Sequence, residues 1–126
     1  MKEQLVEEIV AEAYDTLNMP RNKSRETSHA QTRAAVAVAL NTYFAQLPIS
    51  KSLGINRSTI SHYKGKHEEN LKWWGGYGSK YKVARAITDS RFYSEVTEIN
   101  IDVTLKQIRS LEEKLDRLRN SRGTNL

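Results

Sequence analysis

The chain has 126 residues, a net charge of +5 at pH 7 and no cysteine. This length suits one domain with an appended segment, and the lack of cysteine excludes a disulfide framework and a thiolate metal site. No apolar run is long enough to span a bilayer, and the acidic N-terminus has no apolar signal-peptide segment, so we expect a cytoplasmic protein that does not enter a membrane.

The positive charge is concentrated in the middle of the chain. Residues 1–20 have a net charge of −4 and residues 86–126 have a net charge of 0. Because the whole chain has +5, residues 21–85 have +9. Such segregation is typical of a nucleic-acid-binding surface. A solvated basic face would give the same count, so the charge supports nucleic-acid binding only together with a motif.

Two helices are predicted before the centre of the chain. Apolar residues at three- and four-residue steps predict an amphipathic helix over residues 3–17, which ends before Pro20. Residues 34–50 contain no charged side chain, and their alanine-rich sequence predicts a buried scaffold helix. We expect the core to form around this second helix, with Leu40 and Ile60 in one cluster.

The segment between these helices is basic. Ser24 or Thr27 is expected to cap the helix that follows it. Basic side chains beside a helix N-terminus favour phosphate, through their own charge and through free backbone N–H groups. The candidate contacts to phosphate or to a minor groove are Lys23, Arg25 and Arg33.

Residues 48–66 have the pattern of a helix-turn-helix. Ile49 and Leu53 are four residues apart and share a helix face. Gly54 follows directly and can adopt the positive φ that ends a helix and reverses the chain. Ile55 is expected to fill the corner between the two helices.

The second helix of this motif has an apolar back and a front rich in hydrogen-bond donors. Asn56 or Ser58 is expected to cap it, and Ile60 and Tyr63 continue its buried face. Such a front suits the DNA major groove, whose base edges present acceptors. The alternative is an ordinary pair of surface helices with a glycine stop. The candidate DNA contacts are Arg57, Ser58, Thr59, Ser61, His62, Lys64 and Lys66.

Residues 56–63 resemble the signature of the DNA-binding domain of the replication initiator DnaA, which runs Asp-His-Ser/Thr-Thr-Val-any-His-small. The matching residues are Ser58, Thr59 and His62, with Ile60 as a conservative replacement. The departures are at Asn56, Arg57 and Tyr63. Over about residues 21–67, the resemblance implies an all-helical, Trp-repressor-like domain of the bacterial or phage regulator type that reads duplex DNA through both grooves.

Residues 64–85 combine lysines with aromatic side chains, and a turn or loop is expected at residues 75–78. Gly65 is expected to end the recognition helix. Trp73 and Tyr77 lie between lysines and could stack on the bases of a single strand. More often, two adjacent tryptophans close a small core, with one inward and one at its rim. We therefore favour the core interpretation for Trp73 and Trp74.

No catalytic or metal-binding pattern accompanies the motif. His62 and His67 are five residues apart and do not share a helix face, as a zinc-binding pair would require. The sequence contains no phosphate loop, nucleophile elbow or paired-carboxylate pattern. We expect a protein that is not an enzyme and has no metal or cofactor.

A long helix is predicted over residues 91–120. Its apolar residues fall on heptad positions, with Thr104 interrupting one row, which indicates a short coiled coil and a homodimer through residues 101–118. Alternation over residues 99–105 also resembles a strand, but no partner strand is visible. The apolar stripe comprises Ile101, Leu105, Ile108, Leu111, Leu115 and Leu118. The alternative to a dimer is packing of this stripe against Leu5, Ile9 and Tyr14.

The sequence thus predicts an all-α protein. A helical DNA-binding domain would occupy residues 1–90, and residues 91–126 would form the C-terminal helix. The leading function is sequence-specific binding of double-stranded DNA in transcription or replication. The alternatives are a non-catalytic adaptor that uses the C-terminal helix and a single-stranded nucleic-acid binder.

Overall fold

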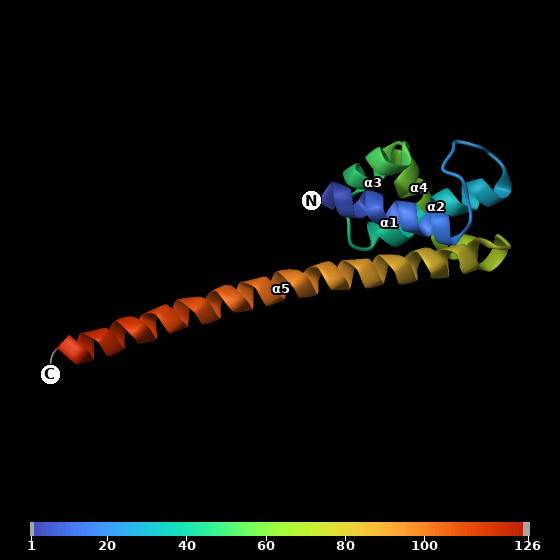
Figure 1. The fold of residues 1–126 in the computed structure, drawn as a ribbon. Coiled ribbons are helices and arrows are strands. Elements are labelled where there is room, and N and C mark those ends of the chain that lie inside the picture. The colour runs from blue at the N-terminus through green and yellow to red at the C-terminus, as the bar shows by residue number, and fades with distance from the viewer. Residues whose placement is uncertain (1, 125–126) are drawn as a thin grey trace. The chain divides into compact units, whose positions relative to one another are not determined.

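The computed structural model describes the backbone of residues 2–124 and the side chains of residues 2–120. Across this described part the secondary structure is five α-helices and no strand, which confirms the all-α class. The helices are α1 (Lys2–Thr16), α2 (Thr27–Asn41), α3 (Gln46–Leu53), α4 (Arg57–Trp73) and α5 (Tyr77–Thr124) (Figure 1). None of the described helices is both long and apolar enough to cross a lipid bilayer.

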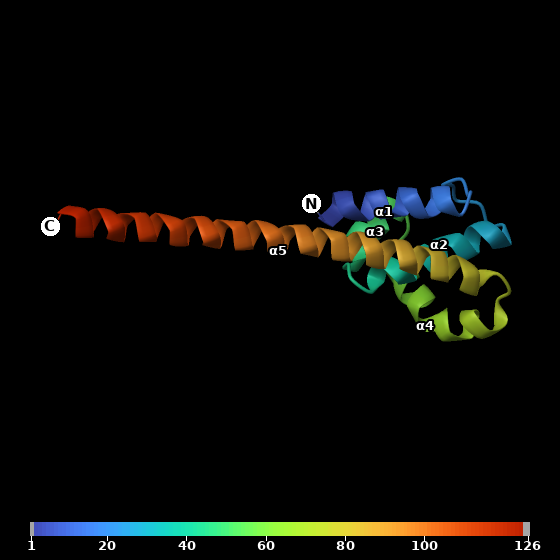
Figure 2. The ribbon, with the colours of Figure 1, turned by 60° about the horizontal axis from the view of Figure 1, so that its bottom comes forward.

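The chain divides into two units, unit 1 (Met1–Phe92) and unit 2 (Tyr93–Leu126). Unit 1 contains α1 to α4 and the first part of α5, and unit 2 contains the rest of α5. Within unit 1, α2 and α3 lie between α1 and α4 (Figure 2).

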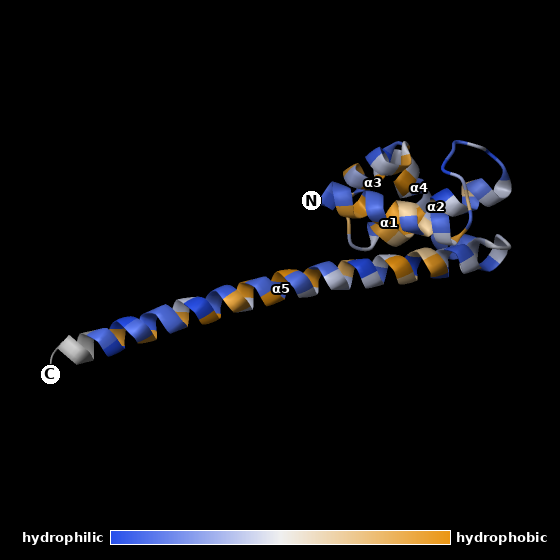
Figure 3. Cartoon of the chain, in the orientation of Figure 1, coloured by the Kyte–Doolittle hydropathy of each residue, from blue (hydrophilic) through white to orange (hydrophobic). Residues whose placement is uncertain are grey.

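The core of unit 1 forms around α2, as the alanine-rich sequence predicts. Seven consecutive residues of α2, residues 34–40, are buried, and apolar residues are frequent along α1 and α2 (Figure 3). Leu40 and Ile60 are both fully buried and belong to one cluster, which confirms that prediction. The same cluster takes Val6, Ile9 and Val10 from α1 and Ile49 from α3.

The prediction of one helix over residues 34–50 is wrong, because α2 ends at Asn41 and α3 begins at Gln46. Pro48 provides the physical reason. In a continuous helix the carbonyl of Phe44 would need the N–H of residue 48, which proline lacks. In the structure Asn41 Nδ2 donates to the Phe44 carbonyl at 3.0 Å instead. Pro48 then lies in the first turn of α3, where no intrahelical N–H bond is lost.

Two of the capping predictions also need correction. The N-cap residue of α2 is Glu26, and not Ser24 or Thr27. Ser24 Oγ instead accepts a hydrogen bond from the Glu26 N–H at 3.2 Å. Asn56 is the N-cap residue of α4, but its side chain makes no capping hydrogen bond.

The boundary between α4 and α5 differs most from the sequence prediction. Gly65 does not end α4, which continues to Trp73, and α5 begins at Tyr77 and not near residue 91. The reason is Tyr77, which is fully buried and stacks between Trp74 and Tyr81. This aromatic packing makes the first turns of α5 part of unit 1 and limits the loop to residues 74–76.

A ring stack and a hydrogen bond near its end also hold the first part of α5 within unit 1. Tyr43 stacks on Phe92 with ring centroids 4.2 Å apart, and its hydroxyl donates to Asp89. Asp89 also accepts from Arg85 Nε at 2.8 Å. The hydrogen bond from Tyr43, together with the one from Arg85, holds the pKa of the Asp89 carboxyl below its usual value.

Candidate nucleic-acid interface

The turn between α3 and α4 is fixed by Gly54 and by the residues that flank it. Gly54 has φ +67°, the left-handed conformation that the sequence predicts for this position. The Ile55 N–H donates to the Ser50 carbonyl at 3.2 Å, and the Ser50 hydroxyl donates back to the Ile55 carbonyl. The half-buried Ile55 side chain packs against the core cluster. These contacts set the angle at which α4 leaves the turn.

The back of α4 faces the core. Ile60 is fully buried, and Tyr63 and His67 are half-buried along the same side. His67 Nδ1 lies 2.7 Å from the Tyr77 hydroxyl, and its ring packs against Tyr81. Burial lowers the pKa of His67, and it raises that of Tyr77. His67 is therefore a packing residue of unit 1.

The front of α4 is exposed. At 100° per residue, Ser58 and His62 lie about 20° from the direction opposite Ile60, whereas Ser61 lies about 80° from it, on the side of α3. Arg57 and Lys64 are seven residues apart and lie along one flank. Thr59 and Lys66 are also seven apart and lie along the other, with Thr59 half-buried. The predicted contact residues of this helix therefore spread over about 220° of its surface, with cations on both flanks of Ser58 and His62.

Charge along α4 changes between its two ends. Residues 57–66 contain Arg57, Lys64 and Lys66 and no acid. Residues 67–73 contain Glu68 and Glu69 with one lysine. The cationic end is thus the N-terminal half, which follows the turn. Glu69 forms an exposed ion pair with Lys66, whose Nζ lies 3.5 Å from the carboxylate.

Ser61 has a protein partner that the sequence did not indicate. Gln46 Nε2, in the first turn of α3, donates to Ser61 Oγ at 2.8 Å. The contact connects the two helices of the motif at their exposed edge. Because the Ser61 hydroxyl still has a proton to donate, it remains a candidate contact.

The basic segment after α1 lies beside the turn. Arg21 forms an ion pair with Glu7 of α1 and donates from Nη2 to the Ser52 carbonyl of α3 at 2.7 Å. Arg21 and the Ser52 hydroxyl also hold the pKa of the Glu7 carboxyl below its usual value. Lys23 Cε comes within 3.7 Å of the position a Cβ on Gly54 would take. The structure therefore brings Lys23 next to the turn from which α4 starts.

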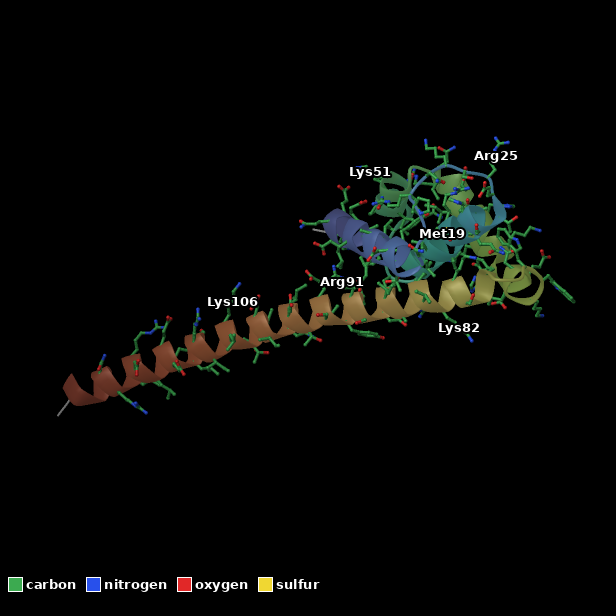
Figure 4. The ribbon with its side chains drawn as sticks, turned by 45° about the vertical axis from the view of Figure 1, so that its right-hand side comes forward. Met19, Arg25, Lys51, Lys82, Arg91 and Lys106 are labelled. Carbon is green, nitrogen blue, oxygen red and sulfur yellow. The ribbon has the colours of Figure 1, made fainter. Side chains whose placement is uncertain are left out.

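Arg33 and Arg25 have different environments. Arg33 is half-buried and donates from Nη1 to the Asn22 carbonyl at 3.1 Å, so it supports the conformation of the basic loop. Arg25 is exposed. Arg25 and Lys51 project from the side of unit 1 opposite to Lys82 (Figure 4). The contact of Arg21 with Ser52 joins segments that are distant in sequence, so no local sequence pattern predicts it.

A hollow of about 490 Å³ lies along the outer side of α4. Trp73 at its edge is 83 % exposed, whereas Trp74 packs against Tyr77. The core interpretation therefore holds for Trp74 and not for Trp73. The hollow is lined by His62, Tyr63, Lys66, Glu69, Asn70, Trp73 and Trp74.

Comparison with protein-family models, with curated proteins and with solved structures finds no match for this chain. The candidate interface therefore rests on its own geometry and charge.

Proposed function

We propose that this protein is a non-enzymatic, sequence-specific binder of double-stranded DNA that regulates transcription or replication. In this proposal α4 lies in a major groove, with Ser58, Ser61 and His62 towards the base edges. Arg57 reaches a guanine edge, because its fork of donors matches the two acceptors there. Lys64 and Lys66 contact phosphates on the two sides of the groove.

One observation carries the proposal. The exposed residues at the start of α4 are hydrogen-bond donors and include no acid, and they follow directly after a turn with a left-handed glycine. The N-terminal residues of a recognition helix are those that reach base edges in helix-turn-helix proteins. The acidic residues Glu68 and Glu69 lie further along the helix, and Lys66 exchanges its exposed ion pair with Glu69 for a phosphate in this proposal. The resemblance of Ser58, Thr59 and His62 to the DnaA signature supports the same orientation.

The basic loop supplies the second contact in this proposal. Lys23 lies beside the turn, and Arg25 is exposed on the same loop. We infer that these two residues bind the backbone or an adjacent minor groove. Arg33 holds the loop in place through Asn22 and contacts DNA only secondarily.

A matched pair of lysine variants tests the proposal. Lys64→Ala removes a cation from the flank of α4, and Lys82→Ala removes one from an exposed position on the first part of α5. Binding to labelled duplexes is measured by fluorescence anisotropy at several salt concentrations. Loss of one phosphate contact flattens the slope of log K against log salt by about 0.9. Lys64→Ala should show this change on all duplexes, and Lys82→Ala should not.

The outcomes separate the proposal from its alternatives. If Lys64→Ala and wild type bind every duplex with the same affinity and slope, α4 is not the interface. If the chain binds no duplex even at low salt, the adaptor function is preferred. Both results would contradict duplex recognition by this surface.

Single-strand binding is the second candidate, because Trp73 is exposed beside Lys66 and His62 at the hollow along α4. Base stacking on an aromatic side chain contributes about 1–3 kcal/mol per base. Trp73→Ala would then weaken binding to single strands and leave duplex binding unchanged. Preferential binding of wild type to single-stranded over double-stranded oligonucleotides would favour this candidate.

We also propose that the protein acts as a homodimer through residues 101–118. A single helix-turn-helix reads few base pairs, and dimers gain specificity from a second half-site. The apolar stripe from Ile101 to Leu118 supplies the contact surface. If light scattering finds only monomers at tens of micromolar, the stripe is not a dimer interface.

A further inference from the structure

The described part of unit 2 is a helix whose large apolar side chains are exposed. The six apolar residues of the stripe are between 45 % and 62 % exposed. Apolar positions recur along α5 between hydrophilic ones (Figure 3). Isolated exposed apolar residues are normal on a protein surface, but six in a row at helical spacing indicate an interface. The stripe consists of Ile101, Leu105, Ile108, Leu111, Leu115 and Leu118.

Charge in unit 2 is divided between its two halves. Residues 93–105 contain the acids Glu95, Glu98 and Asp102 and no base, so they carry −3. Residues 106–122 contain six bases and three acids, so they carry +3. The bases are Lys106, Arg109, Lys114, Arg117, Arg119 and Arg122, and the acids are Glu112, Glu113 and Asp116.

This division determines the favourable orientation of two copies. In a parallel pair, the acidic half of each copy lies beside the acidic half of the other. Residues 101, 108 and 115 take heptad position a, so Lys114 is at position g and Arg119 at position e. In a parallel coiled coil g faces e of the second helix, which places Lys114 beside Arg119 of the second copy. A parallel pair is therefore repulsive at these contacts.

An antiparallel pair brings unlike charges together. When the two stripes overlap fully, Ile101 packs against Leu118 of the second copy, and Ile108 packs against Leu111. Position e then faces position e, so Glu98 lies beside Arg119 of the second copy. The acidic half of each helix lies along the basic half of the other, and the same core positions are filled.

We propose that unit 2 pairs with a second copy of this chain as an antiparallel coiled coil centred between residues 109 and 110. The apolar stripe of each copy thus packs against the stripe of the second copy, which runs in the opposite direction. Thr104 meets Leu115 of the second copy in this arrangement, so each dimer has two weaker layers in its core.

The proposed orientation refines the homodimer of the proposed function, and this part rests on that proposal. Residue 93 of each copy lies about 25 Å from the centre of the pair at 1.5 Å per residue, so the two points at which unit 2 joins unit 1 are about 50 Å apart.

The absence of native cysteine allows a direct test on the full chain. Asn120→Cys and Ser110→Cys each receive one nitroxide label at an outer heptad position, and pulsed electron paramagnetic resonance measures the distance between copies. In the antiparallel pair, the labels at residue 120 are separated along the axis by about 31 Å and those at residue 110 by about 2 Å. In a parallel pair both separations equal the width of the coiled coil.

A charge-swap series provides an independent readout. Glu98→Lys or Arg119→Glu alone should weaken dimerisation about tenfold, because each places like charges together twice per dimer. The double variant should restore it, which only neighbouring residues can do. The proposal is overturned by a monomeric wild type or by equal short distances at residues 110 and 120. It is also overturned if the double variant loses as much dimer affinity as the two single variants together. None of these results bears on duplex binding by α4, which the lysine pair tests separately.

Discussion

Replacing two glycines of the same motif by alanine should change the free energy of unfolding in opposite directions. Gly54 has φ +67°, and a Cβ placed there would come no closer than 3.7 Å to Lys23 Cε, which is ordinary contact. The cost of Gly54→Ala is therefore conformational, about 1–2 kcal/mol for a left-handed L-residue. Gly65 lies inside α4, and a Cβ there would meet nothing within 4 Å. Gly65→Ala should stabilise by about 0.5–1 kcal/mol, because alanine favours the helix.

Urea unfolding followed by tryptophan fluorescence measures both effects, because Trp73 and Trp74 belong to unit 1. For a unit of this size, 1 kcal/mol corresponds to about 4–8 °C in Tm. Gly54→Ala should therefore melt several degrees below wild type, and Gly65→Ala slightly above it. If Gly54→Ala is as stable as wild type, the turn geometry is wrong, and if Gly65→Ala melts below wild type, the open helical position of Gly65 is wrong. Gly65 also lies on the exposed front of α4, so reduced duplex affinity of the more stable Gly65→Ala would indicate close contact with DNA.

Three further predictions concern the core, the recognition surface and the pH dependence. Leu40→Ala should lower the free energy of unfolding by about 2–5 kcal/mol in urea titrations, because Leu40 is fully buried in the main cluster; a Tm within two degrees of wild type would refute its placement. Arg57→Ala should cost about 1–3 kcal/mol on the preferred duplex and less on random duplexes, and an equal loss on both would assign Arg57 to phosphate. Because burial lowers the pKa of His67, the unfolded chain binds a proton first, and stability should fall as the pH drops below about 6.5. In Tm measurements between pH 7.5 and 5.5, His67→Gln should lose this part of the decline, and an unchanged decline would exclude His67 as its source.

Local patterns predicted most of the fold. The three-to-four spacing in α1 and α5, the uncharged run in α2 and the glycine at position 54 each reflect a rule that acts within a few residues. The break before Pro48 also follows from a local rule, because the sequence shows a proline there and proline has no backbone N–H. The uncharged, apolar run continues across Pro48, and that longer pattern favours a single helix over residues 34–50.

Contacts between distant segments were not predictable in the same way. The start of α5 depends on the burial of Tyr77 against Trp74 and His67, which overrides the turn tendency of Gly78. In the candidate site, the side on which each α4 residue lies follows from helical geometry alone. The position of Lys23 beside Gly54 depends on the bonds of Arg21 to Glu7 and Ser52, and no spacing rule connects these residues.

Selection of binding sites from a random duplex library tests the central claim most directly. The 126-residue chain is incubated with the library at moderate salt, and bound duplexes are amplified and sequenced over several rounds. The account predicts enrichment of a common short motif, with altered preference at one position when the selection is repeated with Arg57→Ala. Failure of the chain to enrich any sequence over the starting library, or an identical motif for both proteins, would contradict sequence readout by Arg57 of α4.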